Sequence, residues 1–248
     1  TSAKDMLISE NIFSSIKIIK PDLSDHGEDH IMNVMANASN LLGDKINDLN
    51  GIELYFICML ILFHDVGNLT EDREKHHEQE VIRTIYDHIR GSKSDFIEER
   101  SILPTVASKH SGTASDGTKD TIKELSLLPG FLFDTQIYTK RSAALLRFAD
   151  ELAEGPHRTS TYMNKFYNFP YSVESKIYHK YAEITKINID RDNHRICLTY
   201  NFKLNAKNSK IEKSSELEFK KLFDFTIKRM LKLEAERKYC KYYCEWLE

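Results

Sequence analysis

An imidazole and a carboxylate stand side by side where the most apolar stretch of the sequence ends. Residues 54–63 read LYFICMLILF, and His64 and Asp65 follow directly. Such a run is expected to enter a protein core, where either group is costly unless it is hydrogen-bonded, paired or bound to a metal. The pair is therefore a first candidate for metal ligation.

The same feature recurs along the first two thirds of the sequence. Apolar residues repeat at helical spacing in several segments, and each segment carries a His or Asp on its apolar face. A single buried His is usually a satisfied core residue, and a single Asp near a helix end is usually a cap. Five converging helices with such residues instead favour a shared cation. They are His30 in the segment 30–42, His64 at the end of 51–65, His77 at the start of 77–89, His110 after the stripe from 102, and Asp150 within 140–153.

The donor types narrow the choice of cation. Imidazole together with carboxylate suits Mn, Fe, Ni, Co or Zn better than Ca or Mg. The expected cofactor is a divalent metal, bound as one or two ions of Mn, Fe, Ni, Co, Zn or Mg.

The elements that must position these residues are mainly α-helical. Only 9 Gly and 5 Pro interrupt the chain, which favours long helices over a many-turned β fold. A first apolar stripe spans 7–19. Alternation from 181 to 204 around Arg191-Asp192-Asn193 predicts a β-hairpin, and a Lys/Glu-rich helix runs from about 214 to the end.

Composition excludes several classes of protein. The formal net charge of −3 and the absence of a basic, aromatic-interleaved face argue against a nucleic-acid partner. For the same reason the protein is not expected to be a metal-dependent nuclease. The segment 54–63 is too short to span a bilayer, so no membrane partner is expected. The cysteines are predicted to be reduced, and no signal peptide is evident, which together indicate a cytoplasmic protein. They are Cys58, Cys197, Cys240 and Cys244.

Three sequence motifs, in this order along the chain, resemble those of a known family. DHGEDHIMNV contains His30, LILFHDVGN contains His64 and Asp65, and LLRFADEL contains Asp150. Together they resemble the H…HD…D pattern of the HD-domain metal-dependent phosphohydrolases, over about residues 20 to 155. The resemblance implies a helical bundle and hydrolysis of a phosphoester by metal-activated water, with Asp65 binding one cation or bridging two. We expect an HD-type helical metal-binding domain over 1–170 and a β-hairpin with a C-terminal helix over 171–248.

The two-metal form of that family adds histidines between the central pair and the final Asp. Here KHHEQEVI offers His76 or His77, and ASKHSG offers His110. His77 is preferred because it is in phase with Val81 and Ile85. His76 is then a surface or substrate-facing neighbour.

Phosphate binding requires cations and hydrogen-bond donors near the entrance of the metal site. Lys109 precedes His110, Arg147 precedes Asp150 by one turn, and Arg158 follows in GPHRTS. Arginine suits bidentate phosphate recognition. Lys109 and Arg147 are thus candidates for catalysis and substrate binding, and Arg158 for substrate binding, against the alternative that all three are surface charges. His26, one turn before His30, and His76 complete the substrate-facing candidates.

The leading hypothesis is a metal-dependent phosphohydrolase acting on a phosphorylated small molecule, a nucleotide or nucleotide-like phosphoester. The alternative is a catalytically weak HD module that senses a nucleotide or docks a protein partner. The 110–120 loop lacks the GYP word that follows a His-Glu pair in cyclic-diguanylate phosphodiesterases. The hairpin or the C-terminal helix could also mediate homo-oligomerisation.

Overall fold

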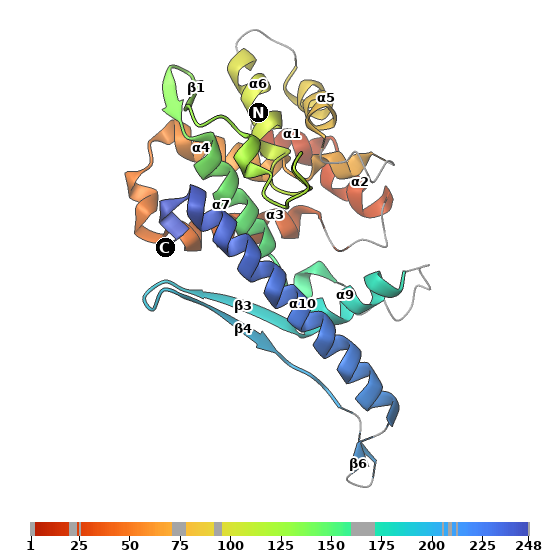
Figure 1. Cartoon of the computed structure of the whole chain (residues 1–248). Helices are drawn as coiled ribbons and strands as arrows, with labels where there is room; N and C mark the ends of the chain where they lie inside the picture. The colour runs from red at the N-terminus through yellow and green to blue at the C-terminus, as the bar shows by residue number, and fades with distance from the viewer. Residues whose placement is uncertain are drawn as a thin grey trace.

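Helices dominate the computed structural model of the chain (Figure 1). It describes residues 3–19, 24, 26–70, 78–91, 96–159, 172–204, 206–207, 210–211 and 213–247. The mainly α fold predicted from the sequence is confirmed. The α-helices are α1 (Ala3–Ser9), α2 (Ile12–Ile19), α3 (Glu28–Leu42), α4 (Gly51–Phe63), α5 (Gln79–Arg90), α6 (Ile97–Ala107), α7 (Thr139–Glu151), α9 (Val173–Ile184) and α10 (Lys213–Tyr243).

The central helix is α4, which contains the apolar run. Its first turn is closed by a capping box, in which the Asn50 side chain accepts from the Glu53 backbone N–H and Glu53 accepts from that of Asn50. The stretch Gly51–Leu69 is long and apolar enough to cross a membrane, but 67% of its most apolar window is buried inside the protein. That burial is what a core helix shows, and it directs the end of α4, with His64 and Asp65, into the interior.

Helix α7 packs between α3 and α10 and also contacts α4 and α6. Ala143, Ala144 and Ala149 are completely buried along it, and their small side chains allow neighbouring helices to approach closely. The Asn37 amide of α3 donates to the Ala149 carbonyl at 3.1 Å. This bond fixes the end of α7 that carries Asp150 against α3.

The first apolar stripe forms two helices rather than one. Asn11, between α1 and α2, has a φ of 55°. This left-handed conformation interrupts a right-handed helix, and Asn adopts it more readily than most residues. Apolar spacing continues across the break, which is why periodicity alone predicts a single segment.

Two short hairpins lie outside the helices. Strands β1 (Gly130–Leu132) and β2 (Thr135–Ile137) pair through a turn at Phe133 and Asp134, both with positive φ. The sequence predicts no strand there, since alternation cannot be recognised over only three residues. The second pair is β5 (Ala206–Lys207) with β6 (Lys210–Ile211).

The predicted hairpin between 181 and 204 is confirmed as β3 (Thr185–Asp190) and β4 (Arg195–Tyr200). Their register pairs Thr185 with Tyr200 and Asp190 with Arg195. Residues 181–184, however, belong to α9. Ile187, Ile189 and Ile196 pack against the core, and α10 packs on α7. The predicted boundary at residue 170 lies outside the described residues.

Candidate metal centre

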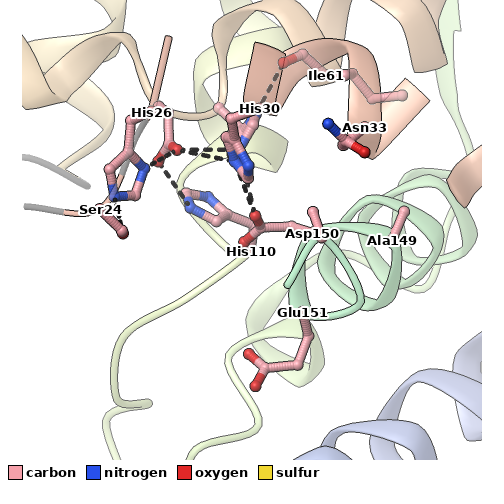
Figure 2. Close-up of polar contacts among 12 residues, drawn as sticks. Ser24, His26, His30, Asn33, Ile61, His110, Ala149, Asp150 and Glu151 are labelled. Carbon is pink, nitrogen blue, oxygen red and sulfur yellow. Dashed lines mark hydrogen bonds and ion pairs between the residues drawn. The ribbon is translucent and has the colours of Figure 1, made fainter. Parts of the chain in front are cut away.

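The ends of four helices bring the predicted ligands together. His30 is the third residue of α3, and His64 follows the last residue of α4. His110 lies just after α6, and Asp150 is the penultimate residue of α7. In Figure 2, His26, His30, His110 and Asp150 point toward one another, whereas Glu151 points away. Residues from widely separated parts of the sequence thus share one site.

Asp65 lies at the centre of the cluster. Its Oδ2 is 2.6 Å from His26 Nδ1, 3.3 Å from His64 Nε2 and 3.4 Å from His30 Nε2. Its other oxygen is 3.7 Å from His110 Nε2. A single carboxylate therefore contacts four imidazoles, and with 5% of its surface exposed it is shielded from water.

Asp150 approaches the same imidazoles from α7. Its Oδ1 is 3.1 Å from His30 Nε2 and 3.8 Å from His64 Nε2. Two groups of three, His30–His64–Asp150 and His64–Asp65–His110, each have ligand atoms within 4.8 Å of one another, as does a third, His26–His30–Asp65. Asp65, His30 and His64 each belong to two groups, which is compatible with one cation or with two that share ligands.

Backbone carbonyls orient two of the rings. His64 Nδ1 is 2.8 Å from the Ile61 carbonyl, and His110 Nδ1 is 2.6 Å from the Ala107 carbonyl. A carbonyl can only accept, so each Nδ1 carries the proton and donates it. In the neutral ring the Nε2 lone pair then faces the cluster, as it does in histidines that ligate metals.

Several buried nitrogens in the cluster lack a hydrogen bond. Neither nitrogen of His30 has a partner of suitable geometry, nor does His64 Nε2, although both rings are completely buried. Buried polar atoms are normally satisfied, and the two carboxylates beside them add negative charge to the same site. A divalent cation would satisfy both requirements, so the residues fit a metal site.

The cluster perturbs its own proton equilibria. Burial disfavours the charged form of His64, but the Asp65 and Asp150 carboxylates outweigh it and raise the pKa of His64 to about 10. Burial and the neighbouring His64 charge lower the pKa of His110 to about 4. Burial alone would raise the pKa of Asp65, yet His64 and His26 hold it well below its ordinary value. The metal-free cluster therefore holds an imidazolium between carboxylates at neutral pH.

Metal binding at pH 7 is expected to release a proton from His64. With a pKa of about 10 the ring is protonated in the metal-free protein, and a ligating imidazole must be neutral. Affinity should consequently rise with pH between 6 and 9. Calorimetric titration with Mn²⁺ in buffers of different ionisation enthalpy measures the proton count. Buffer-independent heats would contradict the assignment, and His64→Gln should lose the buffer dependence.

His26 is a candidate metal ligand, although the sequence predicts for it only a substrate-facing role. Its Nδ1 donates to Asp65 Oδ2, and its ring lies edge-on to the His30 ring, with 5.4 Å between the ring centroids. The available signal was its position, four residues before His30. This spacing was weak evidence because His26 precedes α3, and the side chains of residues outside a helix do not follow helical periodicity.

The predicted phosphate-binding cations are placed differently from one another. Arg158 is buried, and its charge lowers the pKa of His26, so it lies close to the cluster. The Lys109 ammonium is 2.7 Å from Glu124.

The Arg147 guanidinium donates to Glu236 on α10, at 2.5 and 2.9 Å, and also to Thr121 and the Lys119 carbonyl. The structure therefore does not bring Arg147 to the cluster, because Glu236 holds it. His76 and His77 lie outside the described residues.

A helical bundle with an ordered His, His-Asp and Asp set at its centre defines an HD-type domain. The chain belongs to the HD-CE family, whose model matches residues 20–232. The match extends through the β3–β4 hairpin and into α10, beyond the part that resembles the HD core in sequence. No curated protein and no solved structure matches this chain.

A change in metal count distinguishes the groups of ligands. If the group with His110 holds its own cation, His110→Ala should lower the metal content by about one equivalent while the protein stays folded. Elemental analysis after manganese-supplemented expression measures the content. An unchanged count would mean that His110 is not a required ligand. His88→Ala, at an exposed His in α5, is the matched control and should change nothing.

Proposed function

We propose that this protein is a metal-dependent phosphohydrolase that cleaves a phosphoester of a nucleotide or nucleotide-like substrate. The observation that supports it best is the cluster of buried His30, His64 and Asp65 with partly exposed Asp150, in which three imidazole nitrogens make no hydrogen bond of suitable geometry. A stability role alone explains such a cluster poorly, because buried charges stabilise a fold less than apolar residues of similar volume do.

The chain's own residues would divide the work as follows. Asp65 and Asp150 supply anionic ligands, and His30 and His64 supply neutral ones once His64 loses its proton. When bound, a divalent cation supplies activation of water and neutralisation of phosphate charge. The His26 Nδ1–H donates to Asp65 Oδ2 and so orients that carboxylate. The apolar wall formed by α4 limits water access, which strengthens electrostatic interactions inside the site.

Arg158 is the cation that we propose binds the substrate phosphate. Burial opposes its charge, but Tyr178, Asp150 and Glu154 raise its pKa above the ordinary value. It is thus a permanent cation at the edge of the cluster, with its Nε 3.5 Å from the Tyr178 hydroxyl. A planar guanidinium there can engage two phosphate oxygens at once.

Turnover assays test the proposal. The protein is supplied with Mn²⁺ and offered bis(p-nitrophenyl) phosphate, p-nitrophenyl phosphate and a panel of nucleotides. Metal-dependent phosphate or nucleoside release, lost on chelation, is expected. Nucleotide binding without turnover by metal-loaded protein would favour the sensor alternative and contradict hydrolysis. Asp29→Asn, an exposed carboxylate next to His30, is the matched control for substitutions of the cluster.

A further inference from the structure

Helix α10 carries a solvent-exposed apolar stripe. Phe223, Ile227 and Leu231 follow one another at four-residue spacing, which places them on one helix face, and all are exposed, Leu231 by 67%. Met230 widens the stripe. In Figure 1 no other ribbon passes in front of α10. A contiguous exposed apolar stripe of this kind marks an interaction surface.

Charged residues continue the same face at both ends. Stepping by three or four residues from the stripe reaches Lys220 and Glu216 in one direction and Glu234 and Lys238 in the other. The order along the face is acid, base, apolar centre, acid, base. From Glu216 to Lys238 this face is about 33 Å long at 1.5 Å per residue.

We propose that this face of α10 pairs with α10 of a second copy, antiparallel and about a two-fold axis at Ile227. In that arrangement, residues equally distant from Ile227 along the helix face each other. Lys220 then faces Glu234 of the second copy, and Glu216 faces Lys238. Phe223 packs against Leu231, and Ile227 packs against itself, so the apolar stripe is covered by its own copy.

Charge complementarity selects this arrangement. A parallel pair would place each of Glu216, Lys220, Glu234 and Lys238 opposite its own copy, which gives four like-charge contacts. The antiparallel pair converts the same residues into opposite-charge contacts, twice over by symmetry. Such self-complementarity favours a second copy of this chain over an unrelated partner.

The charges are available for these contacts. Glu234 is held in the single chain by Arg237 and Lys238 of its own helix, at 2.7 and 3.5 Å, and all three side chains are 41–69% exposed. Exposed pairs of this kind contribute little, so exchanging them for contacts across the pair costs little. The opposite side of α10 is already occupied, because Thr226, Glu236 and Cys240 are buried against the protein.

Mixing two charge variants tests both the surface and the direction of pairing. Lys220→Glu and Glu234→Lys should each weaken self-association by about tenfold or more, a change of about 1.4 kcal/mol. An equimolar mixture should restore it, because the glutamate introduced in one variant then faces the lysine introduced in the other, while the unchanged Glu234 and Lys220 still face each other. Sedimentation equilibrium of the full chain from about 1 to about 100 µM provides the measurement, and helical circular dichroism verifies folding.

Two further variants fix the register. Ile227→Asp should leave a folded monomer, and Ile227→Cys should form a disulfide-linked dimer under mild oxidation. Lys221 follows Lys220 in sequence and lies outside this face. Lys221→Glu should therefore still self-associate, and Lys221→Cys should not form the disulfide-linked dimer. A parent chain that stays monomeric to about 100 µM overturns the proposal. So does a mixture that associates no better than its components, or a Lys221→Cys variant that crosslinks as readily as Ile227→Cys.

Discussion

Asp65→Asn should reduce metal-dependent phosphoester turnover by about three orders of magnitude or more, with the helical fold retained. The amide has almost the same shape but no charge, and it replaces a side chain that contacts four imidazoles. Metal affinity should fall with it, because an anionic ligand is lost from two of the three ligand groups. Turnover per folded molecule and metal content measure the two effects.

The direction in which Asp65→Asn changes the stability of the protein follows from the pKa of Asp65. The pKa of Asp65 is depressed in the folded protein, so the carboxylate contributes stability above its unfolded pKa, and that contribution is lost as pH falls through the folded pKa. At pH 7 the metal-free variant should therefore melt below the metal-free parent, and Mn²⁺ should raise its melting temperature less. Asp29→Asn should change turnover by less than about twofold. An Asp65→Asn protein that turns over at the parent rate would refute the mechanism.

Glu236→Ala should destabilise the protein by about 3–5 kcal/mol without changing the metal count. It leaves the Arg147 guanidinium, of which 4% is exposed, without its carboxylate partner between α7 and α10. Chemical denaturation gives the loss. Replacing both partners, as Arg147→Met with Glu236→Leu, should restore most of the stability, because an apolar pair removes the uncompensated charge.

The same pair of variants decides what Arg147 does. If its role is to join α7 to α10, the double variant keeps turnover per folded molecule near the parent value. Loss of turnover with stability intact would instead return Arg147 to the substrate-binding role expected from the sequence. Asp87→Asn breaks a bidentate pair with Arg100 at the surface and should cost much less stability.

The sequence by itself was sufficient for the class of fold and for most of the candidate ligands. Apolar periodicity reports which face of a helix is buried, and a His or Asp on that face must meet a partner in the interior. His30, His64, His110 and Asp150 could be selected in this way, since their short side chains stay where the backbone places them, and Asp65 could be selected because it directly follows His64. The hairpin around residues 191–193 was predictable because alternation and turn composition are local.

The tertiary structure decided what periodicity cannot report. Arg147 and Arg158 were both predicted to bind substrate, but a long guanidinium side chain is directed by whichever carboxylate it meets. For Arg147 that carboxylate is Glu236, 89 residues away. His26 joined the cluster because it contacts Asp65, which lies 39 positions further along the chain. Such contacts depend on how the helices pack, and no local pattern of residue types encodes them.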